Sequence, residues 1–203
     1  MKGYYFITDE ALSAAGIMSD AEKAAAAGVA VVQYRNKTAD TRRLYDEARR
    51  LREICAGSGA RLIINDRIDI ALAVDADGVH IGNEDLPYGE ARRLLGAGKI
   101  IGVTVHDVAE AVAAERAGAD YLGVSPIYAT GTKADAGAPC GTETLAAIQR
   151  ACRVPLVAIG GIDLSNADDV IRAGADMVCA ISAVVTKPDV AAEILKFQRK
   201  FNL

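Results

Sequence analysis

The chain has 203 residues, 51% of them hydrophobic, which is enough for one globular domain with a substantial core. Its formal net charge of −4 argues against a broad nucleic-acid-binding surface, which needs clustered Lys and Arg, but a few local cations could still hold a small anion. No apolar stretch approaches the roughly 18 residues of a membrane span, so we expect neither nucleic acid nor a membrane as a partner.

The four cysteines are scattered, and none belongs to a C-x-x-C pair. Because the chain has only two histidines as well, this spacing argues against a zinc site. Single, dispersed cysteines are typical of free thiols in a reducing cytoplasm. The first residues lack the charged and apolar regions of a signal peptide, so we expect a cytoplasmic protein.

Short apolar runs alternate with longer amphipathic segments along the chain. The runs are continuous and rich in Val and Ile, which is typical of strands buried on both faces. Eight strands are predicted: Gly3–Thr8, Val29–Tyr34, Arg61–Asn65, Gly78–Ile81, Ile100–Val105, Tyr121–Pro126, Leu156–Gly160 and Met177–Ile181. Helices predicted between and after them include Thr41–Gly57, Val108–Ala117, Leu145–Cys152 and Val190–Phe201. The expected N-caps are Asp20, Asp40, Asp107 and Ser165.

A weak internal repeat supports this alternation. An Ala-Gly pair precedes a strand at Ala27-Gly28, Ala117-Gly118 and Ala173-Gly174, with a looser copy at Val74–Asp77. Glycine after a helix supplies a left-handed C-cap. Eight successive β-α units predict a single-domain (β/α)8 TIM barrel over residues 1–203. The alternative is an open doubly wound sheet, but the first strand is not followed by G-x-G-x-x-G.

In such a barrel the chemistry lies at the carboxyl ends of the strands. After the second predicted strand come Gln33, Tyr34, Arg35, Asn36 and Lys37. Alternate residues of an extended chain share a face, so Gln33, Arg35 and Lys37 are expected to point one way. Two cations and an amide suit a pyrophosphate, which Arg35 could bind with two parallel hydrogen bonds. The alternative is a solvated strand end with surface charges.

Carboxylates follow the next two predicted strands. Asn65-Asp66 ends one strand, and Asp85 lies shortly after the other. Mg²⁺ commonly takes one or two carboxylates together with substrate phosphates and water, which makes Asp66 and Asp85 candidate ligands. Turn formation or helix capping is the competing interpretation, because Asn and Asp are common in turns. The nearby cationic cluster favours the metal.

The two histidines and one threonine are further candidates. His80 lies inside a strand and is expected to be a buried, hydrogen-bonded histidine rather than a catalytic base. His106 could contact substrate or cap the following helix. Thr104, on the same strand face, is the better ligand candidate, because a hydroxyl both donates and accepts.

The last three strands end in residues that suit a phosphate. Thr130, Gly131, Thr132 and Lys133 combine hydroxyls, a flexible glycine and a cation within four positions. Gly160-Gly161 would let backbone N–H groups approach a ligand, with a tight turn as the alternative. Ile181-Ser182 is expected to end the eighth strand, so these loops resemble the phosphate site that barrels build after strands seven and eight. The anion signals at Thr130–Lys133 and at Gly160-Gly161, on successive strands, predict two phosphorylated substrates.

These motifs together resemble the thiamine phosphate synthase (thiamine-phosphate pyrophosphorylase) family. The resemblance covers nearly the whole chain, and its specificity comes from the order of the motifs rather than from any one. In chain order they are Gln33–Lys37, Ile64–Arg67, Asp77–Gly82 with Asp85–Pro87, Ile101–His106, Pro126–Lys133 and Ala158–Ile162.

The resemblance implies an enzyme that joins hydroxymethylpyrimidine pyrophosphate to a thiazole phosphate, giving thiamine phosphate and pyrophosphate. It implies Mg²⁺ on Asp66 and Asp85. Pyrimidine-pyrophosphate contacts then fall on Gln33 through Lys37, Asn65, Thr104 and Lys133. Thiazole-phosphate contacts fall on Thr130, Gly131, Thr132, Gly161, Ile181 and Ser182. The residues expected to act in catalysis are Arg35, Lys37, Thr104 and Lys133.

Two positions depart from the family pattern, which usually has serine at Thr104 and glycine at Ser125. Neither change removes a charge or a proposed metal ligand. A thiazole tautomerase of the same barrel group is one alternative, although those relatives tend to carry a histidine where Pro126 stands. A non-catalytic barrel that holds thiazole phosphate is another, and it would be expected to lack Asp66 or Asp85. A generic phosphate-binding barrel isomerase or aldolase would leave the strand-two cations unexplained.

Overall fold

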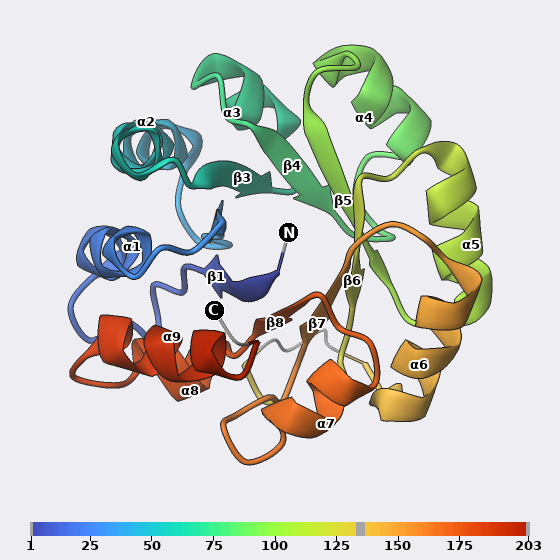
Figure 1. Cartoon of the computed structure of the whole chain (residues 1–203). Helices are drawn as coiled ribbons and strands as arrows, with labels where there is room; N and C mark the ends of the chain where they lie inside the picture. Colours follow the sequence, from blue (N-terminus) through green and yellow to red (C-terminus); the bar gives the residue numbers. More distant parts are fainter. Residues whose placement is uncertain (1, 133–136, 202–203) are drawn as a thin grey trace.

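In the computed structural model, which describes residues 2–132 and 137–201, eight parallel strands close into a barrel in chain order, β1 to β8. The strands form the inner ring and the helices the outer ring (Figure 1). The strands are β1 (Gly3–Ile7), β2 (Val31–Tyr34), β3 (Arg61–Asn65), β4 (Gly78–Ile81), β5 (Ile100–Val105), β6 (Tyr121–Val124), β7 (Leu156–Ile159) and β8 (Met177–Cys179). β1 pairs with β8, with Gly3 opposite Met177, and this pairing closes the sheet. The predicted (β/α)8 barrel is confirmed.

Helices follow the strands and cover the outside of the barrel. They are α1 (Ile17–Ala26), α2 (Thr41–Ser58), α3 (Ile68–Ala73), α4 (Tyr88–Leu95), α5 (Val108–Ala117), α6 (Gly141–Ala151), α7 (Ala167–Arg172), α8 (Ile181–Val185) and α9 (Val190–Arg199). No helix in the described part of the chain combines the length and apolarity that crossing a bilayer requires.

The strands are buried on both faces, as their continuous apolar runs predict. On β1, Tyr4 packs outward against Phe197 of α9, with ring centroids 5.3 Å apart. The next residue, Tyr5, points the other way and contacts Tyr121 of β6 across the barrel interior. This alternation gives the molecule two layers of core, one inside the barrel and one between the strands and the helices.

Several predicted strand ends are wrong by one to two residues. β6 ends at Val124 rather than Pro126, because proline has no N–H to donate to the ladder. β8 ends at Cys179, and Ile181-Ser182 begin helix α8 instead of ending a strand. β1 and β7 each stop one residue early, and β2 begins at Val31.

The helix predictions hold with shifted ends. α5 has the predicted bounds, whereas α6 begins four residues before Leu145 and α9 ends at Arg199. Asp40 and Asp107 are confirmed as N-caps, since each side chain accepts a hydrogen bond from the backbone N–H three residues later.

The other two predicted caps are wrong. Asp20 lies inside α1, where its backbone already bonds to Gly16, and its buried carboxylate accepts a hydrogen bond from Ser13 Oγ. Ser165 precedes α7 without capping it, because its N–H and hydroxyl both donate to Asp163. The repeated helix stop is confirmed: Gly28, Gly118 and Gly174 have φ of 76°, 101° and 109°, and Asp75 of the looser copy has φ 52°.

Candidate active site

A polar pocket of about 370 Å³ opens at the carboxyl ends of β2 to β5, and we call it the β2–β5 pocket. It brings together six of the predicted residues, which come from three successive strand ends and from β5. They are Arg35, Lys37, Asn65, Asp66, Asp85 and Thr104. The expectation that polar residues after the strands converge is therefore met on this side of the barrel.

The cationic segment after β2 has two faces, as predicted. Arg35 and Lys37 line the pocket, and Gln33 lies on the same face one step deeper, only 1% exposed. Tyr34 and Asn36 point the other way, where Tyr34 Oη donates to Glu47 of α2 at 2.5 Å and Asn36 Nδ2 donates to the same carboxylate at 3.3 Å. Tyr34 and Asn36 therefore do not line the β2–β5 pocket.

Residues after β1 fix the position of Arg35. Its backbone N–H donates to Thr8 Oγ1 at 2.9 Å, and its Nη1 lies 3.6 Å from the buried carboxylate of Asp9. Sequence reasoning missed this support, although Thr8-Asp9 directly follows an apolar strand and the rule for strand ends would have found it.

The two predicted metal ligands lie close together. Asp66 adopts φ 62° directly after β3, and its N–H donates to the His80 carbonyl of β4 at 2.8 Å. Asp85 Oδ2 accepts from Gly82 N–H at 2.7 Å. Burial raises the pKa of Asp85, and the neighbouring Asp66 carboxylate raises it further, against the opposing effects of Gly82 N–H and Lys37. A hard cation bound by both carboxylates would offset the repulsion between their negative charges.

Lys37 Nζ lies 2.6 Å from Asp66 Oδ2, so one cation and one carboxylate of the pocket form an ion pair. Across residues 2–132 and 137–201 no set of three or more His, Cys, Asp or Glu side chains is arranged to hold a metal ion. The residues present therefore fit a cation that takes two protein carboxylates and completes its shell with water or substrate oxygens, as Mg²⁺ does.

His80 is buried and hydrogen-bonded, as expected. Its Nδ1 lies 2.9 Å from Tyr121 Oη and its Nε2 lies 2.8 Å from Thr104 Oγ1. His106 lines the pocket. Its backbone N–H donates to Glu110 Oε2 in the first turn of α5, and its ring Nδ1 lies 2.9 Å from the same oxygen. These bonds hold His106 beside the first turn of α5, whose N-cap is Asp107. Because His106 also lines the pocket, its contact with substrate stays a prediction.

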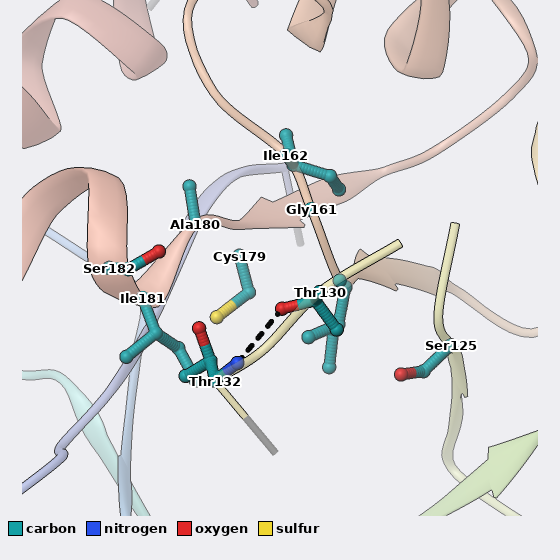
Figure 2. Close-up of a pocket in the computed structure, with 11 residues that line it drawn as sticks. Ser125, Thr130, Thr132, Gly161, Ile162, Cys179, Ala180, Ile181 and Ser182 are labelled. Atoms are coloured by element: carbon teal, nitrogen blue, oxygen red, sulfur yellow. Dashed lines mark hydrogen bonds between the residues drawn. The ribbon is translucent and has the colours of Figure 1, made fainter. Parts of the chain in front are cut away.

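A second cavity lies at the ends of β6 to β8, and we call it the β6–β8 pocket (Figure 2). A smaller part of about 20 Å³ adjoins a more open groove of about 470 Å³. Predicted residues line both parts, namely Thr130, Thr132, Gly161 and Ser182, while Gly131 lines the groove and Ile181 the smaller part. Thr130 Oγ1 accepts a hydrogen bond from Thr132 N–H at 3.2 Å. Lys133 lies outside the described residues.

Glycine allows the close packing of this pocket. Gly161 has φ 63°, and a Cβ there would lie 2.6 Å from the Ala129 carbonyl and 2.7 Å from Tyr128 Cβ. The backbone after β7 therefore lies directly against the segment that carries Thr130 and Thr132. This packing requires glycine whether or not a ligand is present, so binding of a ligand by the Gly161 N–H group stays a prediction.

Ser125 belongs to both pockets, which sequence reasoning did not foresee. It is 8% exposed and lines the β2–β5 pocket as well as the β6–β8 pocket. In Figure 2 its hydroxyl lies on the side of the pocket opposite Ser182. The two cavities therefore meet at the end of β6, and a molecule in each would be adjacent.

A (β/α)8 barrel with two adjoining polar pockets, cations and paired carboxylates at its carboxyl end belongs to the class of phosphate-handling barrel enzymes. The family model described as thiamine monophosphate synthase matches residues 4–184. The chain belongs to this family.

Individual relatives agree with this assignment. The chain is 52% identical to the thiamine-phosphate synthase of Chloroflexus aurantiacus over 189 residues, covering 93% of this chain and 87% of the relative. It is 48% identical to that of Methanosarcina mazei over 194 residues, covering 96% and 80%. Among solved structures, thiamine phosphate pyrophosphorylase from Pyrococcus furiosus matches with a TM-score of 0.91 and 36% identity, covering 98% of this chain and 95% of that one.

Proposed function

We propose that this chain is a thiamine-phosphate synthase that joins hydroxymethylpyrimidine pyrophosphate to thiazole phosphate and releases pyrophosphate. The observation that carries the proposal is the meeting of two pockets at Ser125, one with two cations and the Asp66–Asp85 pair and one with hydroxyls and glycines. Such a pair suits one substrate with a metal-bound pyrophosphate and a second with a single phosphate. The family membership and the named relatives support the same activity.

The reaction breaks the bond between the pyrimidine methylene carbon and the pyrophosphate oxygen and forms a bond from that carbon to the thiazole nitrogen. The electron pair of the broken bond leaves with pyrophosphate, so the protein must stabilise negative charge there. We assign this role to Arg35 and Lys37, and to Lys133 from its sequence motif. Asn65 is a proposed pyrimidine-side contact. Gln33 is kept as one from its sequence motif alone, because its amide is buried below the pocket, where Nε2 donates to Tyr5 and Oε1 has no partner among the described residues.

Mg²⁺ is the proposed cofactor, held by Asp66 and Asp85, and when bound it would offset charge on the leaving group. The thiazole phosphate is assigned to the β6–β8 pocket, with contacts from Thr130, Gly131, Thr132, Gly161, Ile181 and Ser182. No protein nucleophile is required, so the chain contributes positioning and electrostatics. Tyr34 and Asn36 act as supports in this scheme, because they face α2 instead of the pocket.

The direct test is formation of thiamine phosphate by the purified chain with both substrates and Mg²⁺. Product is expected only when all three are present. Turnover that persists in excess chelator would remove the metal role, and binding of thiazole phosphate without any product would favour a tautomerase or a binding barrel. The tautomerase has the weaker case, because Pro126 occupies the position where those relatives tend to have histidine.

The shared position of Ser125 leads to a prediction about substrate approach. Ser125→Leu is expected to lower kcat by roughly a hundredfold, because a bulky side chain between the pockets separates the reacting atoms, and misplacement of about 1 Å can cost that much. Each substrate alone should still bind within a few-fold of its wild-type affinity, which calorimetric titration would measure.

Ser125→Gly is the matched control at this position. It removes the side chain without filling the boundary, so kcat should stay within about tenfold of wild type, with a stability loss of up to about 1 kcal/mol from the added backbone freedom. Equal kcat values for the leucine and glycine variants would contradict the proposed meeting of the substrates at Ser125.

A further inference from the structure

Five polar side chains form a continuous hydrogen-bonded chain from the barrel interior to the β2–β5 pocket. Gln33 Nε2 donates to Tyr5 Oη at 2.9 Å, and Tyr5 Oη lies 2.7 Å from Tyr121 Oη. Tyr121 Oη lies 2.9 Å from His80 Nδ1, and His80 Nε2 lies 2.8 Å from Thr104 Oγ1. The first four side chains are buried, and of the five His80 and Thr104 line the pocket, with Thr104 the more exposed of the two.

Two glycines on neighbouring strands make room for the rings. A Cβ on Gly102 of β5 would lie 1.9 Å from Tyr121 Cζ, and a Cβ on Gly123 of β6 would lie 2.9 Å from His80 Cε1. The His80 and Tyr121 rings stack with centroids 5.5 Å apart and an interplanar angle of 26°. The rings are thus held in one arrangement by packing, and only the protons between them can be placed in more than one way.

The proton order follows from the donor at the buried end. Burial raises the pKa of both Tyr5 and Tyr121, so each hydroxyl keeps one proton. Tyr5 Oη accepts from Gln33 Nε2, which cannot accept in return, so the Tyr5 proton goes to Tyr121 Oη. The Tyr121 proton then goes to His80 Nδ1. This leaves the ring proton of a neutral His80 on Nε2, facing Thr104.

The opposite proton order requires the Gln33 amide to be turned over. Both N–H groups of that amide would then be buried away from Tyr5, whereas the observed orientation leaves only the carbonyl oxygen without a partner among the described residues. Buried N–H groups without partners are rarer than under-satisfied carbonyl oxygens, and each costs about 1–3 kcal/mol. The observed orientation is therefore favoured.

We propose that Tyr121 holds His80 as the neutral Nε2–H tautomer and that His80 in turn directs the Thr104 hydroxyl outward as a hydrogen-bond donor to an acceptor atom of the substrate. Because His80 donates to Thr104 Oγ1, the Thr104 proton is left for the pocket. His80 and Tyr121 are positioning residues in this arrangement, and Thr104 is the residue that touches substrate. The assignment of that substrate rests on the proposed function, whereas the tautomer does not.

The first experiment reads the tautomer without substrate. In ¹⁵N-histidine-labelled full-length protein, two-bond correlations distinguish a protonated ring nitrogen from an unprotonated one. The chain has two histidines, and His106→Gln assigns the His80 signals. Protonated Nε2 with unprotonated Nδ1 is expected for His80. Protonated Nδ1, or an imidazolium, would overturn the proposal whether or not the chain proves to be a synthase.

The second experiment compares two phenylalanine variants that each remove one hydroxyl from the same buried chain. Tyr121→Phe removes the donor to His80 Nδ1, so the tautomers should mix and kcat should fall about tenfold, with KM changed less. Tyr5→Phe leaves Tyr121 able to donate to His80, so the Nε2–H tautomer should persist. Thermal melts report the stability loss of both variants.

A rescue test separates positioning from packing. His80→Gln keeps an N–H donor toward Thr104 and should retain more kcat than His80→Leu, which has none. If Tyr121→Phe and Tyr5→Phe give the same tautomer and the same kcat, or if the two His80 variants are equally active, the positioning role is refuted. The tautomer measurement on the unaltered chain stands even where a variant fails to fold.

Discussion

Asp66→Asn is expected to lower magnesium-dependent turnover by roughly a hundredfold or more while the barrel stays folded. Asp66 and Asp85 lie in the β2–β5 pocket, where burial and the neighbouring Asp66 carboxylate raise the pKa of Asp85. Asparagine removes the charge that would bind the cation. It also tolerates the left-handed backbone at φ 62°, so the change tests charge rather than conformation.

Asp75→Asn is a matched control, because it makes the same substitution at another positive φ, 52°. Asp75 precedes β4 at the opposite end of the barrel, where it is paired with Lys99, so activity should not change. Both variants should melt near the wild-type temperature in chelator, since the exposed ion pairs that they lose contribute about 1 kcal/mol or less.

Thermal melts with added Mg²⁺ give a second readout that does not depend on turnover. A ligand that binds only the folded state raises stability by an amount set by its concentration over Kd. The wild type and Asp75→Asn should therefore gain stability with Mg²⁺, and Asp66→Asn should gain little. Full activity of Asp66→Asn with an unchanged magnesium response would refute the metal assignment.

The pattern of apolar runs was sufficient to predict the (β/α)8 barrel. Strands buried on both faces are continuous in sequence, and the Ala-Gly stops at Gly28, Gly118 and Gly174 mark where each new strand follows a helix. The rule that strand ends converge then brought Arg35 and Asp66 to one pocket. That prediction depends only on β2 and β3 being neighbours in the barrel, and it does not require their exact register.

The errors arose where an apolar run continues past the end of its strand. Ile181 is apolar and follows β8, but its backbone begins α8, because hydrophobicity alone does not distinguish the last residue of a strand from the first buried residue of a helix. The N-cap predictions for Asp20 and Ser165 were wrong for a different reason, because both side chains have other partners. Each has the right side chain for a cap, and a neighbouring group, Ser13 or Asp163, binds it instead.

The buried chain of hydrogen bonds could not be predicted from single strands. Tyr5 and Tyr121 are 116 residues apart and meet only because the barrel closes. In the sequence each is one more aromatic residue in an apolar run, which is the usual pattern of a core residue. The glycines at 102 and 123 were visible, but the rings that fill their space come from other positions on the barrel.

Gly161→Ala is expected to weaken thiazole-phosphate binding by roughly a hundredfold, through positive-φ strain of about 1–3 kcal/mol together with a steric conflict. At φ 63° the new Cβ would lie 2.6 Å from the Ala129 carbonyl, so the segment bearing Thr130 and Thr132 must move away from β7. That movement displaces the hydroxyls assigned to the phosphate. Calorimetric titration with thiazole phosphate, and its KM during turnover, would measure the effect.

Gly59→Ala is the control that introduces the backbone strain of a positive φ without a steric clash. Gly59 has φ 78° at the end of α2, at the other end of the barrel, and a Cβ there would meet no atom within 4 Å. This variant should lose about 1 kcal/mol of stability and no affinity. The KM for pyrimidine pyrophosphate should stay near wild type in Gly161→Ala as well, because Arg35 and Lys37 lie in the other pocket. Equal losses for both substrates would mean that the β6–β8 pocket does not serve one substrate alone, and the assignment of a separate phosphate to each pocket would have to be given up.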